Sequence, residues 1–418
     1  MNVTFQPFAP MGTVDAPPSK SDVHRAIICA ALSGGVCTIA PVALSNDIRA
    51  TIACVEALGA VTKIENNILT VDGEGMFSRE RAVLDCGESG STLRFMVPVA
   101  AAGGVAATFA GSGRLPERPI GIYTEVLPKA GVTCRTKGGL PLEISGRLRS
   151  GDFLIPGDVS SQFISGLLFA LPLLRGDSRI LLTTPIQSAG YINMTIRTMA
   201  KFGIEISILD NGWYIRGGQH YVPSDYRTDG DWSQAAFFMV AGAIGGDVTV
   251  RGVNIDSAQG DKRIAAVLRD FGAEVIQEGG SVRVRKQPMR ATEIDASQIP
   301  DLVPVLAVCA CFAEGVTRVT NAARLRIKES DRLRTTAALL SSLGGNVREL
   351  PDGLEITGVK SLAGGSADGC NDHRIVMSAA VCAAGAAGEI TCSDAMSINK
   401  SYPDFYADYA KIGGIFQK

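Results

Sequence analysis

The chain repeats one pattern at a nearly constant interval, and this repetition constrains the fold more than any other feature. Six apolar helical segments each end at a glycine, and the intervals between successive glycines are 72, 72, 69, 72 and 69 residues. The six glycines are Gly59, Gly131, Gly203, Gly272, Gly344 and Gly413. This spacing indicates six copies of one supersecondary unit.

A second family of helical segments runs in phase with the first. Each begins with polar capping residues and is then almost wholly apolar, as expected of a helix buried on all sides. A short strand-like segment follows it, and two short strands around a turn follow each glycine-ended helix. The six segments are 20–35, 88–104, 160–176, 231–246, 301–315 and 372–385. The sequence therefore predicts an α/β fold of repeated helix–strand–loop–helix–strand–strand units.

The repeats also predict two domains. The sixth copy ends at G-G-I-F-Q-K, too early for its closing strands, and strand-like residues at the N-terminus can supply what is missing. We therefore expect one domain of three repeats at 18–228 and a second made of 1–17 plus 229–418. The chain would cross twice between them, which permits hinge closure over a ligand in the cleft.

Composition excludes several classes of protein. The chain has 418 residues and a net charge of -2, without a basic stripe for nucleic acid or an apolar run of membrane-spanning length. Its first residues do not resemble a secretory signal. The ten cysteines lie mostly in apolar runs, as in reduced cytoplasmic proteins, and the three histidines are scattered. We expect a cytoplasmic protein with no metal site.

The densest cluster of charge is Arg324–Arg334, R-L-R-I-K-E-S-D-R-L-R. Ser330 or Asp331 is a plausible N-cap for the helical pattern that follows. Because a helix N-terminus already favours anions, the basic residues add to the same field. This pattern predicts a cradle for a multiply charged anion, with Lys328 and Glu329 placed to move protons. The alternative interpretation is a solvated, salt-bridged helix start.

Basic and hydroxyl residues also gather at the helix starts of the other copies, the fourth copy being poorest. Each group alone is weak evidence for a binding site: S-S-Q is most often a helix cap, and G-E-S-G-S-T lacks the lysine of a P-loop. Together, in a chain of near-zero net charge, they indicate a strongly anionic ligand held partly by arginine forks. The residues are Lys20, Ser21, Arg25, Gly90, Arg94, Arg114, Arg118, Ser160, Ser161, Gln162, Ser188, Tyr191, Asp301, Arg374 and Lys400.

Taken together, these groups resemble a known family. The combination of K-S-x-x-x-R, E-R-P-I, S-S-Q, I-P-D, R-I-K-E-S-D-R, D-H-R and K-S-Y-P-D is similar to that of the 5-enolpyruvylshikimate-3-phosphate synthases, and the resemblance covers the whole chain. It implies a two-domain inverted α/β barrel of six βαβαββ repeats, three per domain. It also implies transfer of the enolpyruvyl group of phosphoenolpyruvate to the 5-hydroxyl of shikimate 3-phosphate, without a metal or organic cofactor.

The resemblance carries over to individual residues. The shikimate 3-phosphate ligands would be Ser21, Arg25, Ser160, Ser161, Gln162, Ser188 and Lys328. The phosphoenolpyruvate ligands would be Lys20, Gly90, Arg118, Arg332, Arg374 and Lys400, and Tyr191 would border both substrates.

The reaction also needs acid–base groups. The hydroxyl must lose its proton while C3 of phosphoenolpyruvate gains one, and collapse of the tetrahedral intermediate then reverses the acid–base roles and expels phosphate. Asp301 is the candidate at the hydroxyl, Glu329 the candidate at C3, and Lys20 could serve either role. Glu88 departs from the family pattern, which commonly has asparagine at that position.

Three rival interpretations stand beside this one. The sister transferase that acts on UDP-N-acetylglucosamine has Lys-Asn where this chain has Lys20-Ser21, and a reactive cysteine that the loop G-S-G-R-L-P-E-R-P lacks. RNA 3′-phosphate cyclase shares a related repeat, but the pI of about 6.0 argues against nucleic acid. A non-catalytic anion-binding scaffold would leave Asp301 and Glu329 unexplained. We expect a monomeric synthase, since one chain supplies both halves of the cleft.

Overall fold

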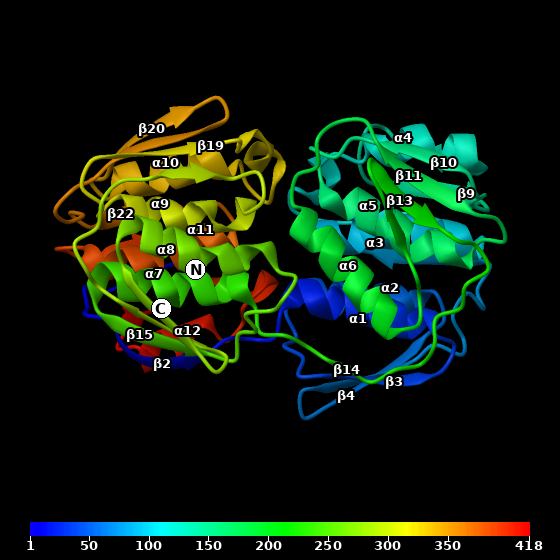
Figure 1. Ribbon diagram of the computed structural model, residues 1–418, viewed down its shortest axis with the longest axis horizontal. Coiled ribbons are helices and arrows are strands. Elements are labelled where there is room, and N and C mark those ends of the chain that lie inside the picture. The colour runs from blue at the N-terminus through cyan, green and yellow to red at the C-terminus, as the bar shows by residue number, and fades with distance from the viewer. The chain divides into compact units, whose positions relative to one another are not determined.

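The computed structural model describes all of residues 1–418 and divides into two compact units. One unit is Pro18–Thr228, and the other joins Met1–Pro17 to Asp229–Lys418; we call them the 18–228 unit and the 229–418 unit. Both chain termini belong to the 229–418 unit (Figure 1). No helix in the protein combines the length and the apolar character that crossing a membrane requires.

Six helices form the interior of the two units, as the apolar segments predict. Nearly every residue of these helices is buried, and α7 of the 229–418 unit begins with the fully buried Trp232. In the same unit α7, α9 and α11 pack against one another. The six are α1 (Lys20–Leu32), α3 (Gly90–Gly103), α5 (Ser161–Ala170), α7 (Trp232–Gly245), α9 (Val303–Ala310) and α11 (His373–Cys382).

The helices that precede the six repeat glycines form the second family, with a 3-10 turn, Pro128–Ala130, between α4 and Gly131 in the second copy. They are α2 (Asn46–Ala57), α4 (Gly121–Val126), α6 (Ala189–Lys201), α8 (Ile264–Phe271), α10 (Arg332–Ser342) and α12 (Phe405–Lys411). All six glycines of the repeat have a positive φ, between 80° and 117°. A residue with a Cβ is strained in that left-handed conformation, so glycine is the residue that ends a helix in this way. The period in the sequence therefore reflects a left-handed backbone conformation that recurs once in each repeat.

Each repeat has one four-stranded sheet. In the spatial orders given below, the first two strands pair in parallel, and the other neighbouring strands pair antiparallel. In spatial order, the sheets of the 18–228 unit are β14 (Tyr226–Arg227), β3 (Val36–Ala40), β5 (Ile68–Asp72), β4 (Val61–Glu65); β6 (Arg81–Asp85), β7 (Ala106–Ala110), β9 (Leu142–Gly146), β8 (Val132–Arg135); and β10 (Asp152–Ile155), β11 (Ser178–Leu182), β13 (Gly212–Ile215), β12 (Ser207–Leu209).

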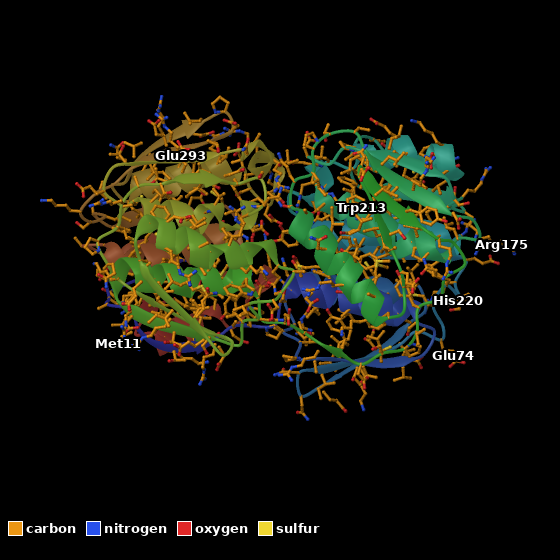
Figure 2. All side chains as sticks on the ribbon, in the orientation of Figure 1. Met11, Glu74, Arg175, Trp213, His220 and Glu293 are labelled. Carbon is orange, nitrogen blue, oxygen red and sulfur yellow. The ribbon has the colours of Figure 1, made fainter.

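The sheets of the 229–418 unit follow the same order of pairing. They are β2 (Met11–Asp15), β15 (Asp247–Arg251), β17 (Ser281–Arg285), β16 (Glu274–Glu278); β18 (Glu293–Asp295), β19 (Val316–Thr320), β21 (Gly353–Thr357), β20 (Asn346–Leu350); and β22 (Gly365–Ala367), β23 (Ile390–Cys392), β1 (Val3–Phe5), β24 (Phe416–Gln417). Met11, at the start of β2, is exposed at the surface (Figure 2).

The N-terminal strands complete the 229–418 unit, as the sequence predicts. β1 pairs antiparallel with β23, and β2 pairs in parallel with β15. One detail of the prediction is wrong, because the sixth copy does have a closing strand. Phe416 and Gln417 form β24, which pairs with the other edge of β1. The stacking of Phe416 on Tyr406 helps to hold this short strand, since two residues alone make little backbone pairing.

Candidate active site

The starts of the buried helices carry most of the predicted ligands. In the 18–228 unit, α1 begins at Lys20, α3 at Gly90, and α5 at Ser161. The first backbone N–H groups of each helix lack partners within the helix, and the helix dipole makes that end positive. Each start is therefore suited to a negatively charged group even before its side chains are considered.

Arg25 is a deeply buried predicted ligand of this unit, being 2% exposed. Its Nε donates to Thr195 Oγ1 at 2.8 Å, and its two terminal nitrogens donate to the carbonyl oxygens of Ser21 and Tyr191 at 2.5 and 2.9 Å. The guanidinium carbon also lies 5.1 Å from the centre of the Phe95 ring. Burial lowers the pKa of Arg25 to about 10, so it remains a cation at neutral pH.

Gln162 is fixed by α3. Its Oε1 accepts from Arg94 at 2.7 Å and its Nε2 donates to Ser91 at 2.9 Å. The Ser160 hydroxyl caps α5 by accepting from the Gln162 backbone N–H at 3.3 Å. The capping interpretation of S-S-Q therefore holds for Ser160, and its hydroxyl proton can still be donated to a ligand.

Gly90 and Arg118 are in direct contact. A Cβ on Gly90 would lie 2.8 Å from three atoms of the Arg118 guanidinium group, which is closer than real Cβ contacts. Arg118 itself is 6% exposed. The flat guanidinium group thus lies against the glycine backbone at the positive end of α3. Glycine is required here for close approach rather than for a special φ.

Two more predicted ligands lie at α6. Ser188 precedes this helix, is buried, and has a positive φ of 56°, which is unusual for a residue with a side chain. Tyr191 in the first turn accepts from Arg25 through its carbonyl oxygen, and its ring lies 5.9 Å from the Arg25 guanidinium carbon. Strained backbone of this kind is often found at binding sites.

The 229–418 unit gathers three predicted cationic residues around one carboxylate. Asp301 lies in a short 3-10 turn, Pro300–Leu302, just before α9 rather than in the helix itself. Its two oxygens lie 3.0 Å from Arg332 Nη1 and 3.2 Å from Arg374 Nη2. Lys328 Nζ lies 3.9 Å away. Although burial opposes it, the charges of Arg374, Lys328 and Arg332 hold the pKa of Asp301 well below its usual range.

Arg332 is the centre of this cluster. Besides Asp301, it contacts Glu329 Oε2 at 2.7 Å and Asp372 Oδ2 at 2.9 Å, and its side chain is 2% exposed. Despite burial, which lowers the pKa of Arg332, these carboxylates raise it above its usual value. Asp331 is the N-cap of α10, since it accepts from the Arg334 backbone N–H at 3.2 Å.

Lys328 is a lysine with altered acidity. Burial lowers its pKa to about 8, while the neighbouring carboxylates of Asp301 and Glu329 oppose the shift. A lysine with such a pKa can gain and lose a proton near neutral pH, which is the property required of an acid–base group.

Arg374 lies in the first turn of α11, and Lys400, the last residue of a 3-10 helix at Ala395–Lys400, reaches the start of α11 with its side chain. Arg374 donates to Ser233 Oγ at 2.6 Å and to the Asp301 carbonyl oxygen at 3.0 Å. Lys400 Nζ donates to the Asn371 carbonyl oxygen at 2.5 Å. Two cations are therefore held at another positive helix end, suited to a second anionic group.

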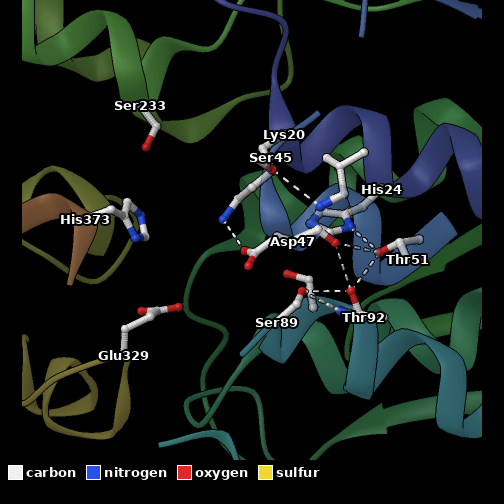
Figure 3. A network of polar contacts seen from close by, with 12 residues as sticks. Lys20, His24, Ser45, Asp47, Thr51, Ser89, Thr92, Ser233, Glu329 and His373 are labelled. Atoms are coloured by element: carbon white, nitrogen blue, oxygen red, sulfur yellow. Dashed lines mark hydrogen bonds and ion pairs between the residues drawn. The ribbon is translucent and has the colours of Figure 1, made fainter. Parts of the chain in front are cut away.

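The structure also reveals polar partners that the sequence did not single out. Asp372 has no exposed side chain; it caps α11 and binds Arg332. Asp47 Oδ2 lies 2.6 Å from Lys20 Nζ (Figure 3). A carboxylate near a helix start looks like an ordinary helix cap in a sequence. Only the motif D-H-R pointed to the position of Asp372, and no motif pointed to Asp47. Two of the three histidines differ in exposure: His24 is buried, and His220 is exposed (Figure 2).

Sequence comparison with known proteins shows the family of the chain. A sequence model described as EPSP synthase (3-phosphoshikimate 1-carboxyvinyltransferase) matches residues 8–408. The 3-phosphoshikimate 1-carboxyvinyltransferase of Clostridium novyi is 42% identical over 431 residues, covering 100% of this chain and 98% of the relative. That of Clostridium kluyveri is 42% identical, covering 99% and 97%.

Solved structures agree in fold. An EPSP synthase from Acinetobacter baumannii superposes with a TM-score of 0.84 at 25% identity and covers 100% of both chains. The enolpyruvyl transferase NikO from Streptomyces tendae has a TM-score of 0.80 at 18% identity, covering 100% of this chain and 98% of its own. The second likeness bears on the fold alone.

Proposed function

Since the chain belongs to the EPSP synthase (3-phosphoshikimate 1-carboxyvinyltransferase) family, we propose that it joins the 5-hydroxyl of shikimate 3-phosphate to C2 of phosphoenolpyruvate and releases phosphate. The observation that best supports this proposal is the Asp301 cluster. It combines an ionised carboxylate, two buried arginines and a lysine of lowered pKa. Such a group can bind an anion and exchange protons with it.

The proposed ligands divide between the two substrates. The residues for shikimate 3-phosphate are Ser21, Arg25, Ser160, Ser161, Gln162, Ser188 and Lys328. Those for phosphoenolpyruvate are Lys20, Gly90, Arg118, Arg332, Arg374 and Lys400, with Tyr191 bordering both. Arginine forks and helix N-termini suit the phosphate and carboxylate groups that both substrates carry.

In the first step Asp301 accepts the proton of the 5-hydroxyl, whose oxygen bonds to C2 while Glu329, in its protonated form, gives a proton to C3. The product is a tetrahedral intermediate with a methyl group. In the second step C3 returns a proton to Glu329, the C2–O bond to phosphate breaks and restores the double bond, and the proton held by Asp301 passes to the departing phosphate. Lys20 and Lys328 offset the negative charge that develops on the phosphate and hydroxyl oxygens.

Substrate binding also changes the basicity of Asp301. In the free protein the Arg332 and Arg374 charges stabilise its ionised form. When the carboxylate and phosphate of phosphoenolpyruvate take up hydrogen bonds from the same guanidinium groups, that stabilisation weakens. The pKa of Asp301 then rises, and the carboxylate becomes a better base.

The activity is tested by measuring phosphate release from phosphoenolpyruvate with either shikimate 3-phosphate or UDP-N-acetylglucosamine as the acceptor. We expect release with shikimate 3-phosphate alone. Release with the sugar nucleotide alone would assign the chain to the sister reaction, and release with neither would exclude both. We further propose that the enzyme acts as a cytoplasmic monomer, which light scattering of the active protein would test for its oligomeric state.

The contact between Gly90 and Arg118 predicts a selective binding defect. In Gly90→Ala, the new Cβ displaces the Arg118 guanidinium group, so the KM for phosphoenolpyruvate should rise about tenfold, equivalent to about 1.4 kcal/mol. Stability should change little, since the end of a flexible side chain can move. Gly121→Ala is the matched control, because Gly121 also begins a helix and its Cβ would meet no atom within 4 Å. An unchanged KM in Gly90→Ala would contradict the assignment of Arg118.

The lowered pKa of Lys328 predicts a limit to activity at alkaline pH. Below about pH 8 its ammonium group is charged and attracts the anionic substrate; as the pH rises through this value, the charge is lost. The kcat/KM should therefore fall about tenfold per pH unit above 8. In Lys328→Arg the cation persists, so this decline should begin at higher pH, whatever the maximal rate. Identical alkaline declines in both proteins would exclude Lys328 as their cause.

A further inference from the structure

Lys20 needs a precise position if it is to act at the substrate. Its side chain has four rotatable methylene groups and is 17% exposed, so its ammonium group has many accessible positions in the absence of a partner. The carboxylate of Asp47 approaches it to 2.6 Å and restricts them (Figure 3). Asp47 is itself largely buried, its side chain being 12% exposed.

Asp47 is held by the start of α2. The N-cap Ser45 is 1% exposed and accepts from the Ile48 backbone N–H at 3.4 Å. Asp47 lies in the first turn, where the helix dipole favours its negative charge. Its backbone lies close to two hydroxyl groups as well, because its carbonyl oxygen is 3.4 Å from Thr51 Oγ1 and 3.5 Å from Thr92 Oγ1.

A buried chain of hydroxyl groups extends this anchor to α1 and α3. Thr51 Oγ1 lies 2.6 Å from His24 Nδ1 and 2.7 Å from Thr92 Oγ1. Thr92 Oγ1 donates to Ser89 Oγ at 2.8 Å, and Ser89 is the N-cap of α3. All four residues are 0–1% exposed. Figure 3 shows the chain of contacts from His24 to Ser89.

The histidine contributes to this network as a neutral group. Burial, together with the charges of Lys20 and Arg25, holds the pKa of His24 well below its usual range. The network therefore introduces no further cation beside Lys20, and its hydrogen bonds persist over the physiological pH range. Buried hydrogen bonds of this kind hold a fixed geometry.

We infer that Asp47 is a positioning residue for Lys20, set in place by the Ser89–Thr92–Thr51–His24 network, which also connects it to the start of α3 at Gly90. This inference rests on the proposed role of Lys20 at phosphoenolpyruvate. Asp47 is not expected to touch a reacting atom. It acts through the ammonium group of Lys20, which it holds by the 2.6 Å ion pair.

A positioning role and a purely electrostatic role of Asp47 predict different effects on kcat and on the KM. An acidic residue near the binding site of phosphoenolpyruvate, an anion, disfavours its binding. Removing the charge of Asp47 alone should therefore leave the KM for phosphoenolpyruvate unchanged or lower it. Loss of position instead lowers kcat, because a displacement of about 1 Å can cost a hundredfold in rate. For Asp47→Asn we therefore expect kcat to fall about 10- to 100-fold with no increase in the KM for phosphoenolpyruvate.

A double-mutant cycle tests the route of the effect, using phosphate release with shikimate 3-phosphate as acceptor. If Asp47 acts only through Lys20, the Lys20→Ala/Asp47→Asn protein should be no slower than Lys20→Ala, within about twofold. Asp152→Asn is the matched control, since Asp152 forms a comparable 2.5 Å ion pair with Arg179 at the surface of the same unit. Its kcat should equal that of the wild type.

Two outcomes overturn the inference: an Asp47→Asn enzyme with the wild-type kcat, or additive losses in the double variant. Thermal unfolding of each variant separates these results from loss of fold. Should Asp47→Asn not fold, the same cycle with Asp47→Glu decides, since that variant keeps the charge and moves it by one methylene. Failure of the proposed function is distinguishable, because the wild type itself would then release no phosphate.

Discussion

Replacing Asp301 by asparagine is expected to lower kcat by about a hundred- to ten-thousandfold, the range associated with a general base. The carboxamide retains the shape of the side chain but cannot accept the proton of the 5-hydroxyl. The KM for phosphoenolpyruvate should not rise. Asp301 holds one nitrogen of Arg332 and one of Arg374 in the free protein, so its neutralisation leaves both guanidinium groups more available to the substrate.

This combination, a large fall in kcat without weaker binding, distinguishes a base from a residue that merely maintains the fold. Asp295→Asn provides the control, because Asp295 is an exposed residue of the same repeat that accepts from the Ser297 backbone and the Asn321 side chain. It should leave both kinetic constants unchanged. Wild-type kcat in Asp301→Asn would assign the base to another group, with Lys20 the next candidate.

Replacing Arg332 by methionine should both abolish activity and destabilise the protein. The change removes a proposed phosphoenolpyruvate ligand and leaves Asp372 as a carboxylate with no exposed surface and without its main cationic partner. Breaking a buried ion pair from one side costs about 3–5 kcal/mol. Denaturant unfolding should show a loss of free energy of that size.

A second substitution tests the cause of the instability. Arg332→Met/Asp372→Asn should recover part of the lost free energy, since the uncompensated buried charge is gone, while remaining inactive. Arg348→Met is the surface control, because Arg348 is 67% exposed and pairs only with Glu355 among acidic groups. Its cost should be at most about 1 kcal/mol. Equal destabilisation by the two arginine substitutions would contradict the central role given to Arg332.

Much of the fold was accessible from the sequence, because it depends on local rules repeated six times. A helix that ends in a left-handed conformation requires glycine, and that requirement left a visible period from Gly59 to Gly413. That the N-terminal strands join the C-terminal half was predictable, because the sixth copy ends too early for its closing strands, and β1 indeed pairs with β23. The closing strand at Phe416 was not, since aromatic stacking, rather than any strand pattern, supports so short a segment.

The site was less accessible, because its contacts join residues far apart in the sequence. Arg332 and Arg374 were identified as ligands, but their common partner, the Asp301 carboxylate, was expected at the substrate alone. Asp372 and Asp47 lie in first turns or caps of helices, where carboxylates are common for purely structural reasons. No local pattern distinguishes a capping carboxylate from one that also orients a cation. The roles of the ligand residues are predictions that the substitutions above test.

The most direct test of the account follows hydrogen at C3 of phosphoenolpyruvate. Addition and elimination pass through a methyl group, so the reaction with shikimate 3-phosphate in deuterium oxide should place deuterium in the vinyl methylene of the product. It should do so in recovered phosphoenolpyruvate as well, wherever the intermediate reverts, and Asp301→Asn should slow both. Product formed at the wild-type rate without deuterium would contradict the tetrahedral intermediate and, with it, the acid–base roles assigned to Asp301 and Glu329.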